Sequence, residues 1–141
     1  KELEFLRNAL NIKRIVKISR STFYSDESRL FEIFRNLISN SIKYLDYDKT
    51  EPYIKISVKN NNSKAVITFE DNGVGIDPDL QEYIFDMFYR ANEKSDGSGI
   101  GLYIVKQAVD KLNGSITVKS KKGEGTRFQV TIPNADAQNL N

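Results

Sequence analysis

The sequence NLISNSIKY occupies residues 36–44 and lies within a long helical pattern that runs from about residue 25 to Leu45. Ser25 and Asp26 offer an N-cap for this helix. Apolar side chains recur at helical spacing, and the face that they define toward a core consists of Leu30, Phe34, Leu37, Ser41 and Leu45. The pattern therefore predicts one long helix with a buried side and a polar side.

The polar side of this helix is predicted to hold Asn36, Asn40 and Lys43, opposite the apolar face. Amide oxygens are acceptable hard ligands for Mg²⁺, which usually keeps waters and phosphate oxygens as its other ligands. A lysine supplies a point charge for phosphate oxygens. The three side chains would suit a magnesium-bound polyphosphate, but a solvated polar face would have the same pattern, so the helix alone leaves both interpretations open.

The rest of the chain is divided into strands, turns and shorter helices. Alternation of apolar and polar residues predicts strands at residues 12–23, 53–60, 64–71, 115–122 and 126–133, the last four forming two hairpins. Further helices are predicted at residues 1–12, 78–85 and 100–112, the last ended by Asn113 and Gly114. Sequential strands joined by short turns favour an α/β two-layer sandwich, with a mixed, largely antiparallel sheet and about three helices on one face.

Composition limits the classes of function. The chain has 141 residues, enough for a single domain with one core. It contains no cysteine and no histidine, which excludes disulfides, thiolate metal sites, histidine-ligated zinc and a histidine phosphoacceptor within the chain. The formal net charge of +2 is too small to indicate nucleic acid. The 21 basic and 19 acidic residues are scattered along the sequence, as expected for a mixed solvated surface.

The sequence DNGVG, residues 71–75, follows a predicted buried strand. An ionised aspartate only accepts hydrogen bonds, so Asp71 in a pocket would select a ligand that offers an amino group, as adenine does and guanine at the equivalent position does not. Gly73 and Gly75 would let the backbone approach a flat base closely. Capping or ordering of a glycine turn is the alternative role for this aspartate.

The sequence GSGIGL, residues 97–102, opens the predicted helix at residues 100–112. Backbone amides at a glycine-rich helix start can bind phosphate, and the helix dipole adds to the attraction. A dinucleotide-binding fingerprint is excluded because a polar loop, and not a strand, precedes these glycines. Arg90 stands at the start of that loop, from where it could reach a terminal phosphate. The sequence GEGT, residues 123–126, is explained most simply as a hairpin turn.

Taken together, the order and spacing of these segments resemble one family. The chain resembles the catalytic domain of sensor histidine kinases, within the superfamily of gyrase-type, chaperone and mismatch-repair ATPases. NLISNSIKY is similar to the N box of that family, DNGVG to its first glycine box, FDMFYR at residues 85–90 to its F box and GSGIGL to its second glycine box. GEGT is similar to its last glycine element. The resemblance covers roughly residues 26–133 and implies a Bergerat-type sandwich that binds Mg-ATP.

The resemblance also implies a role for individual residues. Asn40 would ligate magnesium with Asn36 beside it, and Asn36, Lys43 and Arg90 would act on the phosphates during catalysis. Tyr44 would pack by the adenine, Asp71 would accept a hydrogen bond from the adenine amino group, and Thr126 would help to close the pocket. The implied nucleotide-binding residues are Asn36, Asn40, Lys43, Tyr44, Asp71, Gly73, Gly75, Ile76, Gly97, Gly99, Ile100, Gly101, Leu102 and Thr126. Residues 86–99 would form a lid.

One position distinguishes branches of the superfamily. Hydrolysing relatives place a glutamate four residues before the metal-ligating asparagine, where this chain has Asn36. An amide cannot take up a proton as a general base, so the site should hold ATP for a separate acceptor. A base displaced to Glu32 is an alternative. A regulatory module that binds nucleotide without transfer, and an ATPase or protein-serine kinase of the same fold, are the other classes of function that remain open.

The resemblance implies partners outside the chain. The phosphoacceptor histidine would lie on a dimerisation helix of the parent protein, of which residues 1–12 would be the end or the linker, and a response regulator receiver domain would take the phosphate. Residues 13–133 are predicted to form the catalytic domain and residues 134–141 a disordered tail. We expect a cytoplasmic location, no nucleic acid partner and no membrane contact by this segment, whether or not the parent protein is anchored in a membrane.

Overall fold

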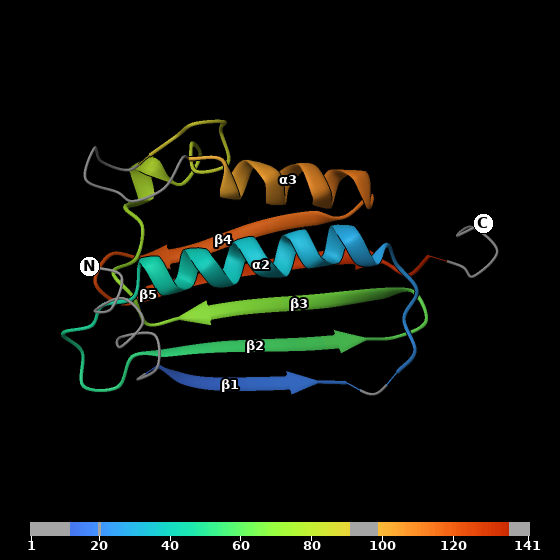
Figure 1. Ribbon diagram of the computed structural model, residues 1–141, viewed down its shortest axis with the longest axis horizontal. Helices are drawn as coiled ribbons and strands as arrows, with labels where there is room; N and C mark the ends of the chain where they lie inside the picture. The colour runs from blue at the N-terminus through green and yellow to red at the C-terminus, as the bar shows by residue number, and fades with distance from the viewer. Residues whose placement is uncertain (1–11, 20, 91–98, 136–141) are drawn as a thin grey trace.

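The computed structural model describes residues 12–19, 21–90 and 99–135. These ranges form one sheet of five strands with two α-helices packed on one face (Figure 1). The elements are, in order, β1 (Lys13–Ile18), α2 (Glu27–Lys43), β2 (Tyr53–Asn60), β3 (Lys64–Asp71), the 3₁₀ turn η1 (Pro78–Leu80), α3 (Gly101–Lys111), β4 (Ser115–Lys121) and β5 (Gly125–Pro133). The predicted α/β two-layer sandwich is confirmed.

The strands lie side by side in the order β1-β2-β3-β5-β4. Only β1 pairs in parallel, with β2, and the three other pairs are antiparallel, which confirms a mixed, largely antiparallel sheet. β1 lies at one edge of the sheet, and it ends at Ile18 and not at residue 23 as predicted. Because β3 joins the two hairpins, its last residue Asp71 lies in register between Ile54 and Thr126.

The helix α2 begins and ends where local chemistry allows. The Asp26 side chain accepts a hydrogen bond from the backbone N–H of Arg29, which satisfies one of the free amides of the first turn. Glu27 in the first turn and Lys43 in the last complement the helix dipole. The helix ends at Lys43, just before the predicted end at Leu45, and the N–H of Tyr44 closes the last turn on Asn40.

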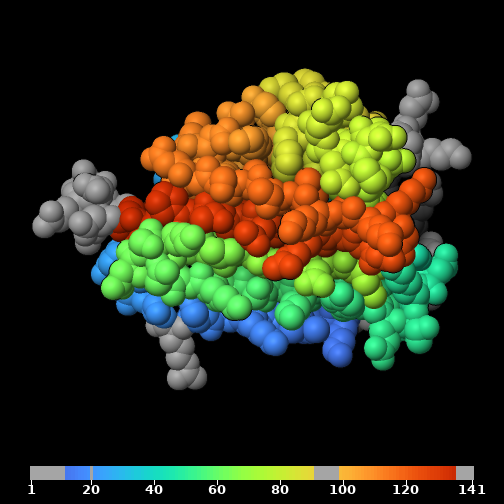
Figure 2. All heavy atoms as spheres, turned by 180° about the vertical axis from the view of Figure 1, so that it is seen from behind, coloured from blue at the N-terminus to red at the C-terminus, as the bar shows by residue number. Residues whose placement is uncertain are grey.

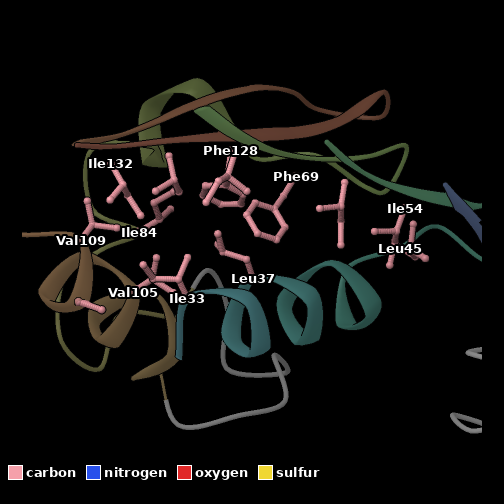
Figure 3. Close-up of a cluster of buried hydrophobic side chains, with 14 of the residues drawn as sticks. Ile33, Leu37, Leu45, Ile54, Phe69, Ile84, Val105, Val109, Phe128 and Ile132 are labelled. Atoms are coloured by element: carbon pink, nitrogen blue, oxygen red, sulfur yellow. The ribbon is translucent and has the colours of Figure 1, made fainter. Parts of the chain in front are cut away.

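The core lies between the helices and the sheet. In Figure 3, Ile33 and Leu37 of α2 and Val105 and Val109 of α3 point toward the inner side chains of the strands. Phe34 packs edge-on against Phe69, with ring centroids 5.1 Å apart. Fifteen buried apolar residues form this single cluster among the described residues, so one continuous core stabilises the fold.

Two details of the predicted helix face were wrong. Ile33 is fully buried although the predicted face omits it, whereas Leu30 and Phe34 are only half-buried. The centre of the buried face thus lies near Ile33 and Leu37. Asn36 and Asn40 are half-buried and flank this face instead of lying opposite it. The outward positions belong to residues such as Phe31, which is 64% exposed with the Arg35 guanidinium over its ring.

The helix prediction for residues 78–85 was also wrong in extent. Only Pro78–Leu80 is helical, as one 3₁₀ turn capped by Asp77, and turns follow it. The structure therefore has two α-helices and one 3₁₀ turn among the described residues, where about three helices were expected. The predicted helix at residues 1–12 falls almost wholly outside the described ranges, as does most of the predicted tail at residues 134–141. None of the described helices is long and apolar enough to cross a bilayer.

None of the helices in the described residues covers the second face of the sheet (Figure 1). Viewed from behind, the strands run across the surface and α2 is hidden beneath them (Figure 2). Strand alternation places eight basic side chains on this open face, together with the single acid Glu70; the basic residues are Lys13, Lys17, Lys55, Lys59, Lys64, Lys119, Lys121 and Arg127. Charges that are scattered along the sequence are therefore separated in space.

Candidate active site

One cavity of about 680 Å³ opens between α2, the end of β3 and the start of α3. This volume suits a ligand the size of a nucleotide. The predicted nucleotide-binding and catalytic residues that line it are Asn36, Asn40, Lys43, Tyr44, Asp71, Gly75, Ile76, Arg90, Gly99, Ile100, Gly101, Leu102 and Thr126. The fold thus brings together, around one space, segments that are up to 90 residues apart in the sequence.

Asp71 is the buried charged group of the cavity. Asp71 is only 7% exposed, and its Oδ1 accepts a hydrogen bond of 2.9 Å from the N–H of Gly73. Ser41 and the backbone of Thr126 also hydrogen-bond to the carboxylate. Burial raises the pKa of Asp71, while these hydrogen bonds and the nearby charge of Lys49 act in the opposite direction. The protein therefore orients the carboxylate, and its hydrogen bonds offset only part of the cost of removing the carboxylate from water.

The loop after Asp71 approaches neighbouring backbone more closely than a side chain would allow. A Cβ added at Gly73 would lie 2.2 Å from the carbonyl oxygen of Tyr44, and the N–H of Val74 donates to that same carbonyl. Gly75 has a φ of +74°, and a Cβ there would lie 2.2 Å from the carbonyl oxygen of Lys121. Gly73 itself does not line the cavity, so its contribution is to hold the loop against α2.

Ile76, which lines the cavity beyond this loop, is held by two side chains that no sequence motif indicated. The hydroxyl of Ser120 accepts from the N–H of Ile76 at 2.7 Å, and it also lies 2.8 Å from the hydroxyl of Thr126. The amide of Gln81 donates to the carbonyl oxygens of both Ile76 and Ser120 at 3.1 Å. Ser120 and Gln81 thus hold the backbone of Ile76, and with it this part of the cavity wall, in place.

The polar residues of α2 enter the cavity from the helix side. The amide nitrogen of Asn36 donates to the carbonyl oxygen of Glu32 at 2.7 Å, and this bond orients its Oδ1 toward the start of α3. A Cβ added at Gly101 would lie 3.3 Å from that oxygen. Asn40 is one turn further along, and Lys43 is exposed at the helix end. Two amides and a cation therefore follow one edge of the cavity.

The start of α3 and the segment before it form the opposite wall. Gly99, with a φ of +73°, accepts a hydrogen bond at its carbonyl from the N–H of Phe88. Arg90 is exposed and lines the cavity near this point. Gly97 and most of the predicted lid lie outside the described residues. The first turn of α3, whose N-cap Ile100 makes no side-chain capping hydrogen bond, therefore lies at this end of the cavity.

Several lining residues were not predicted. They are Ser39, Val74, Asp77, Leu80, Ile84, Tyr89, Ile104 and Lys122. Ile84 and Ile104 follow ordinary apolar patterns, so the sequence gives no reason to separate them from other core residues. Lys122 lies in the β4–β5 turn, and only the pairing of β5 with β3 brings that turn to the cavity. These positions depend on tertiary contacts and have no local signature.

Comparison with known proteins assigns the chain to a family. Residues 25–136 match the model of the histidine kinase-, DNA gyrase B- and HSP90-like ATPase family. Among curated relatives, the methanogenesis regulatory histidine kinase FilI of Methanothrix harundinacea is 38% identical over 77% of this chain and 12% of its own length. Sensor histidine kinase RppB of Synechocystis is 38% identical over 78% of this chain and 24% of its own. The chain thus spans at most about a quarter of these two relatives.

Solved structures of histidine kinases share the fold. The mycobacterial sensor histidine kinase MprB aligns with a TM-score of 0.77 at 26% identity, over 94% of this chain and 89% of that chain. Full-length ShkA, solved in complex with AMPPNP, aligns with a TM-score of 0.78 at 26% identity, over 96% of this chain and 28% of that one. The described sheet and helices therefore have the same arrangement as part of both of these histidine kinases.

Proposed function

Because the chain belongs to the histidine kinase-, DNA gyrase B- and HSP90-like ATPase family, we propose that its cavity binds Mg-ATP and that the domain transfers the γ-phosphoryl group to a histidine. The histidine would lie on a dimerisation helix of the parent protein, and a response regulator receiver domain would accept the phosphate from it. The observation that supports this proposal is that one cavity has a buried carboxylate at one end and a glycine-rich helix start at the other.

The carboxylate end suits adenine. Asp71 accepts from the protein at one oxygen and lines the cavity, so it can also accept from the 6-amino group of the base. Guanine has a carbonyl at that position, which would place two acceptors together and leave both without a donor. Tyr44, Ile76 and Leu80 supply the half-buried surface against which a flat ring can pack.

The helix-start end suits a triphosphate. The first turn of α3 lines the cavity, and the first amides of a helix have no partner within the helix itself. Together with the positive end of the helix dipole, they favour an anion. Lys43, Arg90 and Lys122 line the same cavity and add positive charge. The adenine and phosphate ends belong to one continuous space, so a single nucleotide can contact both.

The residues present also fit a magnesium ion that is brought in with the phosphates. Asn36 and Asn40 would hold it through amide oxygens, which are neutral ligands that Mg²⁺ accepts. The described residues contain no group of three or more acidic, histidine or cysteine side chains that could hold a metal ion without the nucleotide. When bound, the ion would neutralise charge on the phosphate oxygens.

Transfer to a separate acceptor is favoured over hydrolysis by the chemistry at residue 36. The Asn36 amide nitrogen is engaged with the Glu32 carbonyl, and an amide cannot deprotonate water. The chain contains no histidine, so the acceptor must come from elsewhere. Lys43 and Arg90 would stabilise charge on the transferred group, which is the main contribution a protein makes to phosphoryl transfer. A cytoplasmic location, where ATP and receiver domains occur, belongs to the same proposal.

Calorimetric titration with ATP and GTP, each with and without Mg²⁺, tests the nucleotide part of this proposal. We expect binding of ATP that changes with Mg²⁺, and no comparable binding of GTP. The domain would then be mixed with a histidine-bearing helical segment, and the phosphorylated product tested for acid lability. An acid-stable phosphate would indicate a serine kinase, rapid phosphate release an ATPase, and no transfer to any segment a regulatory module. Failure of the folded protein to bind ATP would contradict the proposal as a whole.

A further inference from the structure

Lys49 lies in the loop between α2 and β2, a segment in which no sequence motif was recognised. Its ammonium group donates to the carbonyl oxygen of Asn72 at 2.6 Å. The carbonyl oxygens of Gly73 and Glu124 lie 3.4 and 3.5 Å from the same nitrogen. One lysine thus gathers three backbone carbonyls, and no ion pair joins it to a carboxylate within the described ranges.

The three carbonyls belong to two segments that form one end of the cavity. Asn72 and Gly73 directly follow Asp71, and the N–H of Gly73 orients the Asp71 carboxylate. Glu124 lies in the β4–β5 turn, whose Gly123 donates to the carbonyl of Val74 at 2.7 Å. Lys49 therefore connects three elements at their point of meeting: its own loop, the loop after β3 and the turn before β5.

The side chain of Asn72 holds the same loop from the other direction. Its Oδ1 accepts from the N–H of Tyr53 at 2.9 Å, and its Nδ2 donates to the carbonyl oxygen of Glu51 at 2.9 Å. These bonds already fix the path of the chain at residue 72. What Lys49 adds is a positive charge, placed at the carbonyl oxygens of the two residues that follow Asp71.

This charge bears on the buried carboxylate. Burial raises the pKa of Asp71, and the hydrogen bonds from Gly73, Ser41 and Thr126 together with the charge of Lys49 partly reverse that effect. A bonded ammonium also polarises the peptide between Asn72 and Gly73, whose N–H is the donor to Asp71, because hydrogen bonds in a chain strengthen one another. The ammonium and the carboxylate are linked through that peptide.

We propose that Lys49 is a positioning residue for base recognition: it holds the peptide between Asn72 and Gly73 so that the Asp71 carboxylate stays directed at the exocyclic amino group of the base. The proposal rests on the proposed function, since it assumes that the cavity binds an adenine nucleotide. It goes further in stating that selectivity for that amino group depends on a lysine outside the cavity lining and outside every recognised motif.

A purely structural role for Lys49 would have a different signature. Loss of a structural contact would loosen the whole end of the cavity and weaken all nucleotides alike. Loss of a positioning residue should weaken only the contact with the 6-amino group, and therefore only nucleotides that have this group. Purine riboside triphosphate lacks only that amino group, so its affinity reports stacking and phosphate contacts without the contact under test.

The experiment measures the affinity of ATP and of purine riboside triphosphate for the wild-type domain, Lys49→Met, Lys49→Arg and a control, Lys106→Met. Lys106 is on α3, pairs with Asp110 and does not line the cavity. We expect Lys49→Met to weaken ATP roughly tenfold, the range for loss of a charge-assisted hydrogen bond, and the analogue less than about twofold. Lys49→Arg should restore part of the preference for ATP, and Lys106→Met should leave both affinities unchanged.

A double-mutant cycle completes the test. In an Asp71→Asn background, Lys49→Met should have little further effect on ATP, because the group through which it acts is gone. Equal weakening of both nucleotides by Lys49→Met, or unchanged ATP affinity, would overturn the positioning role. If Lys49→Met does not fold, the comparison between the two nucleotides is made with Lys49→Gln, which keeps a hydrogen-bond donor without the charge, and an unaltered preference for ATP would again overturn that role. A wild-type domain that binds neither nucleotide refutes the proposed function instead.

Discussion

The two faces of the sheet differ in the kind of polar side chain that they hold and in how far these side chains are exposed to water. The described residues include four buried polar side chains, and three of them lie together on the face covered by helices: Asp71 and Thr126 line the cavity, and Ser41 hydrogen-bonds to Asp71. On the open face, eight basic side chains are spread over all five strands. The cavity is therefore marked by few polar groups held out of water, and not by the larger number of exposed charges.

The physical reason is the cost of burial. The charged groups at the ends of the long side chains on the open face keep their water, so their presence requires no partner and indicates none. A carboxylate at 7% exposure loses most of its water and must be compensated by hydrogen bonds. Sequence statistics suggest an even mixture of charges, with 21 basic and 19 acidic residues. The eight basic residues and one acid of the open face leave 13 basic against 18 acidic residues elsewhere, so the even balance hides a strong separation.

The largest difference between the faces should be in stability. Leu37→Ala removes a side chain at 0% exposure on the covered face and should lower the free energy of unfolding by about 2–5 kcal/mol, because the lost contacts leave a cavity. Lys59→Ala, at an exposed position on the open face, should change it by less than about 0.5 kcal/mol. Urea unfolding measures both. Similar losses in the two variants would show that the open face also contributes to folding.

The covered face was largely predictable from the sequence because alternation and helical spacing determine which side chains are inside. Both hairpins, the strands other than the end of β1, and the helix that stops before Asn113 and Gly114 were obtained in this way. Ile33 was missed because Leu30 and Phe34 are equally apolar, and spacing alone does not fix the centre of a wide apolar stripe. The basic face was not predicted, since it requires the strand order β1-β2-β3-β5-β4, which no local pattern contains.

A second prediction concerns the buried carboxylate itself. Asp71→Asn keeps the size of the side chain and an acceptor for the N–H of Gly73, but it removes the charge and one acceptor oxygen. ATP affinity should fall roughly 10- to 100-fold, as expected for loss of a hydrogen bond to a charged group. Titration calorimetry measures it, with Asp110→Asn on the outer surface of α3 as the control. Unchanged affinity in Asp71→Asn would remove this residue from base recognition.

Asp71→Asn should raise the stability of the protein although it lowers ATP affinity, and the size of this gain should depend on pH. Burial raises the pKa of Asp71 above 3.8, so the folded state holds this proton more tightly than the unfolded chain does. The contribution of the carboxyl to stability is therefore present below pH of about 4 and is lost as the pH rises through the folded pKa. The Tm of Asp71→Asn relative to wild type should accordingly be higher at neutral pH than at pH 4. A constant difference between the two Tm values would mean that the carboxylate is fully compensated.

The candidate site was predicted where its residues belong to compact motifs and missed where they do not. Asparagines on one helix, an aspartate before glycines and a glycine-rich helix start are local patterns, and the family match confirms the resemblance that they suggested. Ser120, Gln81 and Lys49 contact the same loops through side chains from distant segments. Hydroxyl, amide and ammonium groups of this kind occur throughout any sequence, so only the three-dimensional contacts distinguish them.

A third prediction concerns the amides at the edge of the covered face. Asn40→Ala should weaken ATP roughly tenfold in the presence of Mg²⁺, because a metal ligand is lost, and much less in its absence. Gln107→Ala removes an exposed amide from the outer side of α3 and serves as the matched control. Calorimetry with and without Mg²⁺ separates the two conditions. An equal loss in both would show that Asn40 contacts the nucleotide and not the ion.

The smallest expected effect is on the open face, where a charge can be reversed to gain stability. Lys119 lies directly opposite Arg127 in the register of β4 and β5, and like charges in this position repel. Lys119→Glu should therefore raise the free energy of unfolding by about 0.2–1 kcal/mol at low salt, and the gain should shrink as salt screens it. Lys17→Glu, whose partner in register is the neutral Ser57, is the control and should not give the same gain. If Lys119→Glu is neutral or destabilising at low salt, the basic side chains of the open face do not repel one another measurably, and their separation from the acidic residues has no energetic consequence for folding.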